Sequence, residues 1–224
     1  LRSTVLCCLV LAAVPFLSSV QTGSAPGAGP DVVSTLWGMW WFQQSWAGAA
    51  WSGWTDLVNH PYGAWGTVLS PSSAILWSLT EPIMGPGRAS ALVGCLQTGG
   101  LALATVWLAR VAGISERGSW VSGLAVLVGR LLVFGIGEGS VVAIAALPIP
   151  LGLASLLRLR QSSRPRDARV WVLASMACMG WTALENPYLA PVLPAVAAVL
   201  IGATAFRWHR EGGRRSGSGP LLVR

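Results

Sequence analysis

The segment 31–63 combines side chains able to do acid–base chemistry with a dense set of aromatic ones. It carries two aspartates, Asp31 and Asp56, and a histidine, His60. A carboxylate beside a hydroxyl acceptor can act as a general base, and tryptophan rings can stack on a sugar or a lipid head group. We therefore take Asp31 and Asp56 as candidate catalytic residues. The candidates for substrate binding in this segment are Trp37, Trp40, Trp41, Trp54 and His60.

Each of these residues also has a structural interpretation. Asp31 precedes a helical pattern of apolar positions, so it could simply be the N-cap of that helix. Tryptophans concentrate where a membrane meets water, so most of them could be interfacial anchors. Asp56 and His60 are four residues apart and could share a helix face, but the sequence NHPYG between and after them is typical of a turn. Two ligands do not make a metal site, so we expect neither a metal nor a cofactor.

A second group of candidates lies further along the chain. Arg130 falls inside an apolar segment, where a cation is costly and marks a functional site by default. It could bind a lipid-linked phosphate, to which guanidinium geometry is suited, or it could form an ion pair that locks helix packing. Glu138 follows two turns later, and Arg88 lies just before the second apolar segment. We take Arg88, Arg130 and Glu138 as further candidates for substrate binding.

The composition sets the class of protein in which these residues must be positioned. Of the 224 residues, 53% are hydrophobic and only 10% are charged. Such a chain cannot cover a soluble surface, so we predict an all-α, polytopic membrane protein. A helix needs about 20 apolar residues to cross a bilayer. Six segments qualify: 3–20, 89–110, 119–137, 139–157, 168–185 and 188–206.

The orientation follows from the arginines, because short cytoplasmic loops accumulate positive charge. Placing the arginine clusters inside leaves 21–88 as an extracytoplasmic loop with interfacial helices, and both termini cytoplasmic. The segment 67–85 then cannot cross the membrane, so it lies in the outer interface or re-enters. The tail 207–224 is predicted to be disordered and cytoplasmic. If 1–20 were instead a cleaved signal peptide, five spans would remain. The arginines are explained by orientation and lipid head groups, so nucleic acid is not an expected partner.

Four local patterns resemble a known family when taken in order. They are PDVVSTLWGMWW, TDLVNHPYG, EPIMGPGRASALVGCLQTGGLALATVWLARVAG and GIGEGSVVAIAALPIPLGLASLLRLR, and they cover roughly 28–160. Their order resembles that of bacterial membrane glycosyltransferases of the GT-C superfamily, in the group of protein O-mannosyltransferases and aminoarabinose transferases. The resemblance implies that the chain corresponds to the N-terminal half of such an enzyme, either as a fragment, as a degenerate relative or as a compact member.

The resemblance implies a transferase of the bacterial inner membrane that moves a sugar from a polyprenyl-phosphate donor to an extracytoplasmic acceptor. By position, Asp31 matches the family's catalytic base and Asp56 is the second choice. The chain departs from the family in having PD in place of the usual GD and in having fewer spans. A noncatalytic membrane subunit that binds lipid is the alternative, and a transporter fragment is the third.

Overall fold

The structure is a computed structural model that describes residues 10, 13, 17–23, 30–47, 54–55, 64–65, 70–133, 147–162, 164–185 and 189–212. Within these residues the protein is all-α, as the composition predicts, apart from one antiparallel pairing of two short strands. The elements are α2 (Leu17–Thr22), α3 (Pro30–Ala47), β1 (Trp54–Thr55), β2 (Ala64–Trp65), α4 (Pro71–Met84), α5 (Pro86–Val111), α6 (Glu116–Val133), α8 (Pro148–Gln161), α9 (Pro165–Glu185) and α10 (Val192–Gly212).

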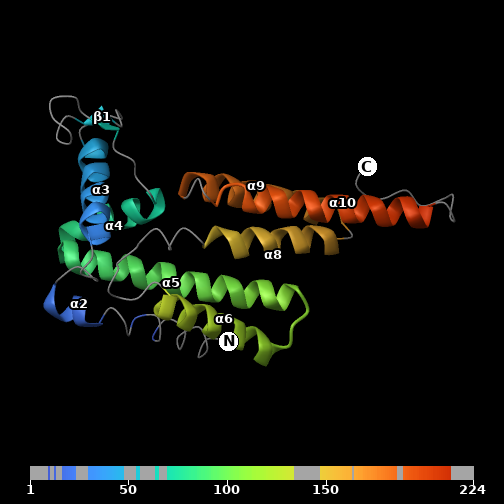
Figure 1. Cartoon of the computed structure of the whole chain (residues 1–224), viewed down its shortest axis with the longest axis horizontal. Helices are drawn as coiled ribbons and strands as arrows, with labels where there is room; N and C mark the ends of the chain where they lie inside the picture. Colours follow the sequence, from blue (N-terminus) through green and yellow to red (C-terminus); the bar gives the residue numbers. More distant parts are fainter. Residues whose placement is uncertain are drawn as a thin grey trace.

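The helices from α5 onward run along one common direction, while α3 runs across it at one end of the bundle (Figure 1). Helices α5 and α6 form an antiparallel pair joined by a short turn at Gly113. Helix α8 runs parallel to α5, because Leu147 lies against Gly100 while Gln161 donates a hydrogen bond to the carbonyl oxygen of Val111. Helix α9 returns antiparallel to both.

The apolar segment at 89–110 corresponds to α5, which extends it slightly at each end. Helix α5 is the one helix in the described part of the chain that is long and apolar enough to cross a membrane, and half of its most apolar stretch is buried in the protein. Helices α6, α9 and α10 overlap three of the other predicted spans. Most of 3–20, and the first part of 139–157, lie outside the described residues.

Helix α4 lies in the segment 67–85, which the sequence predicts either to lie in the outer interface or to re-enter the membrane. It has 14 residues, too few to cross a bilayer. It runs antiparallel to the first half of α5: Trp77 contacts Pro86 and Ser90, and Gln97 contacts the start of α4. The start of α4 is therefore level with a residue 11 positions into α5, or about 16 Å from the beginning of that helix.

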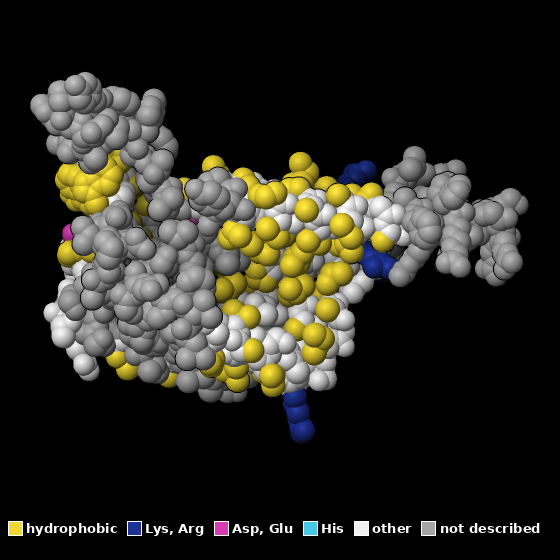
Figure 2. Space-filling model, viewed as in Figure 1, with side chains coloured by type: hydrophobic (Ala, Val, Ile, Leu, Met, Phe, Trp, Pro, Cys, Tyr) yellow, Lys and Arg dark blue, Asp and Glu magenta, His cyan; other side chains and the backbone are white. Residues whose placement is uncertain are grey.

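Apart from Arg88 and Arg130, the arginines of the described residues gather at the end of the bundle away from α3, which we call the arginine end (Figure 2). Two contacts bring the arginine-bearing ends of three helices together. Gln161 at the end of α8 reaches Val111 at the end of α5, and Trp107 of α5 packs against Trp171 of α9, with ring centroids 6.2 Å apart. At the turn between α5 and α6, Arg110 pairs with Glu116 at 2.7 Å.

Helix α9 has the reverse of the pattern expected in a soluble bundle. Its buried positions are small or polar and recur at helical spacing: Ser175, Cys178, Thr182 and Glu185. Its exposed positions include Leu173, which is 67% exposed, Met176 and Leu184. Exposed hydrophobic side chains also cover much of the flank of the bundle in Figure 2. Small residues inside and large apolar residues outside are typical of helices that pack together within lipid.

Close packing of α5 on α6 depends on Gly123. A Cβ at this position would lie 2.5 Å from Val106 Cγ2 and 3.0 Å from the carbonyl oxygen of Ala102, and that oxygen belongs to backbone that cannot rotate away. We expect Gly123→Ala to lower the free energy of unfolding by about 1–3 kcal/mol, as overpacking does. Denaturant unfolding in a fixed detergent measures the loss.

Gly129, on the same helix, is the matched control, because a Cβ there would meet nothing within 4 Å. Gly129→Ala should be neutral, or stabilising by up to about 1 kcal/mol through helix propensity. Equal losses in the two variants would contradict close packing at Gly123.

Candidate functional site

Helix α3 carries the residues that the sequence marks for chemistry. It begins at Pro30, because proline at the first helical position loses no hydrogen bond and has a φ suited to the helix. Asp31 is therefore the second residue of the helix, two positions past the N-cap, so the N-cap interpretation is wrong. A carboxylate in the first turn still interacts favourably with the amide groups of the helix N-terminus. The side chain of Asp31 lies outside the described residues.

Two different faces of α3 are distinguished by what they contact. Met39 is buried and Phe42 packs beside it against α4 and α5. Trp37, Trp40 and Trp41 lie on the other side of the helix, and Trp40 is 39% exposed. The rings of Trp37 and Trp41 are stacked, with centroids 6.1 Å apart and planes within 4° of parallel. The tryptophan face therefore stays available to an outside partner while the Met39 face holds α3 in place.

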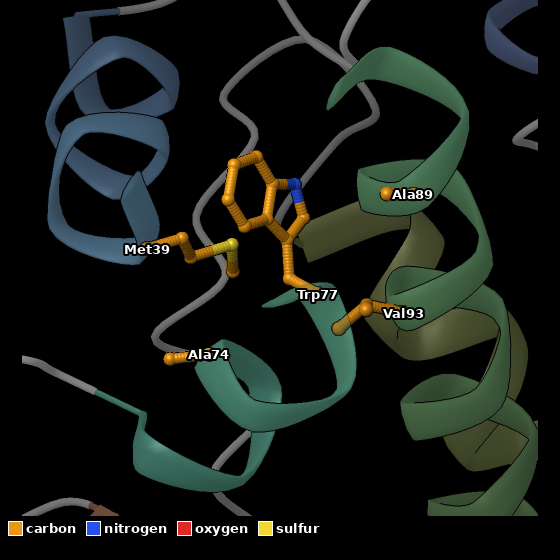
Figure 3. Close-up of a cluster of buried hydrophobic side chains, with 5 residues drawn as sticks. All are labelled: Met39, Ala74, Trp77, Ala89 and Val93. Carbon is orange, nitrogen blue, oxygen red and sulfur yellow. The ribbon is translucent and has the colours of Figure 1, made fainter. Parts of the chain in front are cut away.

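The contact between α3 and the bundle is a small apolar cluster with Trp77 at its centre (Figure 3). The indole ring lies between Met39 of α3 and the helix α5, and it is only 3% exposed. Its Nε1 group donates to the carbonyl oxygen of Pro86 at 3.3 Å and to Ser90 Oγ at 3.1 Å. One turn further along, Gln43 Nε2 of α3 donates to Glu81 Oε2 of α4 at 3.3 Å. Helices α3, α4 and the start of α5 thus form one packed unit.

The other predicted site residues fall in several places. Trp54 lies on β1, where it is paired in register with Trp65, and Asp56, His60 and Glu138 lie outside the described residues. Arg88 is exposed in the first turn of α5. Arg130 belongs to the last turn of α6, and its side chain lies outside the described residues. By the direction of their helices, Arg88 and Arg130 both lie away from the arginine end.

A buried polar cluster, which we call the Glu185 cluster, was not predicted as a site. The carboxylate of Glu185 is 2% exposed and accepts three hydrogen bonds. Oε1 accepts from the backbone N–H of Ser72 at 2.8 Å and from Trp181 Nε1 at 2.9 Å, and Oε2 accepts from Ser70 Oγ at 2.5 Å. The hydroxyl oxygens of Ser70 and Ser73 are hydrogen-bonded at 2.6 Å. The cluster consists of Ser70, Ser72, Ser73, Gln97, Trp181 and Glu185.

Gln97 completes the cluster from the side of α5. Its amide donates to Ser72 Oγ at 3.1 Å and to Ser73 Oγ at 3.2 Å, and the residue is 4% exposed. Three helices therefore meet through hydrogen bonds at the start of α4. The carboxylate faces backbone and side-chain donors, which stabilise a buried anion. In the described part of the chain no three His, Cys, Asp or Glu side chains gather as a metal ion would require.

Glu185 could not have been singled out from its own neighbours in the chain. The donors that surround it on α4 are 113 and 115 residues away. Two features of the sequence could have indicated the pairing: Glu185 is a carboxylate at the end of an apolar segment, and the segment 67–85 has polar residues near its start. The chain has no match among models of known protein families, among curated proteins or among solved structures.

Proposed function

We propose that the chain is a polytopic inner-membrane protein with the six spans that the sequence predicts and the arginine end in the cytoplasm. The observation that carries this proposal is the pattern of α9, where polar and small residues are buried while large apolar residues are exposed. In water this arrangement would expose apolar surface at a high cost, whereas lipid solvates it. The gathering of arginines at one end supports the orientation.

In this orientation α3 lies at the outer surface. It crosses the direction of the bundle at the end opposite the arginines, as an interfacial helix would (Figure 1). Its tryptophan face can then sit among lipid head groups, because tryptophan has an apolar ring and a polar N–H. Helix α4 begins about halfway along α5 and runs back toward this surface, so we assign it to a re-entrant element of the outer loop.

The reaction that we propose for this outer end is transfer of a sugar from a polyprenyl-phosphate donor to an extracytoplasmic acceptor, as the resemblance to GT-C enzymes implies. Asp31 would act as the base on the acceptor hydroxyl, with Asp56 as the second choice. The leaving phosphate needs a cation, for which Arg88 and Arg130 are the candidates at this end. The stacked pair Trp37 and Trp41 would hold the sugar or its lipid.

One observation favours a noncatalytic membrane subunit as a second candidate. Both carboxylate oxygens of Glu185 already accept hydrogen bonds from the chain itself. This buried acid therefore has a structural role that needs no substrate. In that case the tryptophan face of α3 would bind lipid or a partner protein without chemistry.

The test begins with the lipids that copurify with the protein in mild detergent, identified by mass spectrometry. We expect wild type to retain polyprenyl phosphate or its glycosylated form, and Arg130→Ala to lose it. With the donor so identified, Asp31→Asn should lower the rate of transfer by about 100-fold or more, as loss of a general base does.

Arg117→Ala is the control for lipid retention, because Arg117 is exposed at the arginine end. Asp167→Asn is the control for transfer, because Asp167 is exposed in the first turn of α9. Only bulk phospholipid in wild type and both arginine variants would reject the transferase and leave the noncatalytic subunit. Transfer at an unchanged rate in Asp31→Asn would reject Asp31 as the base.

A further inference from the structure

Helix α4 lacks the local cap that normally begins a helix. Ser70 occupies the N-cap position, but its side chain makes no capping hydrogen bond to the first turn. Pro71 follows and has no N–H, so the first amide that needs a partner is that of Ser72. This amide donates to Glu185 Oε1, and the Ser70 hydroxyl donates to Oε2 of the same carboxylate. The cap of α4 is therefore supplied by another helix.

The location of this cap makes it important. The start of α4 is level with the middle of α5, well away from the beginning of that helix. In the proposed orientation this point lies within the membrane, where water cannot satisfy a free amide. A carboxylate is suited to the place, because the N-terminus of a helix carries partial positive charge and exposed amide hydrogens. The end of α9 thus supplies what α4 would otherwise obtain from solvent.

The effect of the cap extends to α3. Met39 packs on Ala74 and Trp77 of α4, and Gln43 donates to Glu81 of the same helix. Helix α3 therefore packs on α4, and Glu185 caps the start of α4. We propose that Glu185 is the positioning residue of the outer loop: its carboxylate holds α4 in its half-inserted place and, through α4, holds α3. This inference does not depend on whether the chain transfers a sugar.

The test is hydrogen–deuterium exchange, followed by mass spectrometry, on the full chain in lipid nanodiscs. In Glu185→Ala we expect the amides in the first turns of α4 to exchange about tenfold faster, in the range expected when a capping residue is removed. Peptides from α3 should change in the same direction. Peptides from α6, which contributes no residue to the cluster, should keep the exchange rate of wild type.

Two further variants separate the hydrogen bonds from the charge and guard against a failure to fold. Glu185→Gln keeps an oxygen for the Ser72 amide and an NH2 group that can donate to Ser70, so its exchange in α4 should stay close to that of wild type. Glu185→Asp keeps the charge but withdraws the carboxylate by one methylene group, so its exchange should lie between those of wild type and Glu185→Ala. Glu116→Ala is the matched control, because this glutamate forms an exposed ion pair at the arginine end.

Two results would overturn the inference. One is exchange in α4 that stays at the rate of wild type in both Glu185→Ala and Glu185→Asp. The other is acceleration of equal size in α3, α4 and α6, since this would mean that Glu185 supports the whole bundle and not the outer loop. Faster exchange confined to α4 and α3 supports it, and this readout requires no donor, acceptor or enzyme activity.

Discussion

Replacing Trp77 with alanine should lower the free energy of unfolding by about 3–5 kcal/mol, the usual cost of removing a buried aromatic side chain. The indole lies where α3, α4 and α5 meet, and its neighbours Met39, Ala89 and Val93 are buried around it. Removing it leaves a cavity that three rigid helices cannot close. In lipid this loss of packing is the main term, because apolar burial drives helices together only weakly there.

Two variants of tryptophan sharpen this prediction. Trp77→Phe keeps most of the ring volume but loses the hydrogen bonds of Nε1 to Pro86 and Ser90. Loss of these hydrogen bonds should lower the free energy of unfolding by about 1 kcal/mol, in addition to the effect of the smaller ring on packing. Trp40→Ala removes the same side chain from an exposed position on α3 and should change the free energy of unfolding by less than about 0.5 kcal/mol. Denaturant unfolding followed by circular dichroism in one detergent measures all three. A loss in Trp40→Ala as large as that in Trp77→Ala would contradict the central position of Trp77.

The sequence predicts the helices of the bundle better than it predicts their contacts. The long apolar segment 89–110 is enough to locate α5, because periodicity is not needed where every face is apolar or small. The polar residues at 70–73 set the segment 67–85 apart from the predicted spans, and the helix found there, α4, begins at Pro71, since Pro71 and the serines are typical of the start of a helix. These features are local, so a single sequence reveals them.

The contacts that define the outer loop depend on residues far apart in the chain. On α3 the tryptophans predict a functional face, whereas Met39 on the opposite face makes the contact with α4 and α5. Either face could have packed inward on composition alone. In the sequence Glu185 is only a carboxylate at the end of an apolar segment, and its donors Ser70 and Ser72 lie at the start of another helix. No spacing within α9 specifies that pairing.

Placing a second carboxylate in the Glu185 cluster should be as damaging as removing Trp77. Gln97 is buried and donates through its amide to Ser72, which in turn donates its backbone N–H to Glu185. Gln97→Glu removes the donor and adds an anion one serine away from the existing one. Two anions in a buried, low-dielectric site repel each other, so we expect a loss of about 3–5 kcal/mol in the free energy of unfolding.

Gln97→Met separates the two causes, because it removes the same donor without adding charge. It should cost about 1–3 kcal/mol, the price of leaving buried polar groups with one partner fewer. The difference between the two variants then measures the repulsion between carboxylates.

The charge argument has a second-site test of its own. Adding Glu185→Gln to Gln97→Glu leaves the cluster with one carboxylate again, so the double variant should be more stable than Gln97→Glu alone even though Glu185→Gln by itself is not stabilising. Residues that interact through a shared network show such nonadditive effects, of about 0.5–3 kcal/mol. If the two changes simply add, Gln97 and Glu185 do not sense each other's charge, and the cluster is a set of separate helix contacts. A rescue would instead establish that α4, α5 and α9 are joined at one electrostatic site, whose single negative charge the start of α4 is built to receive.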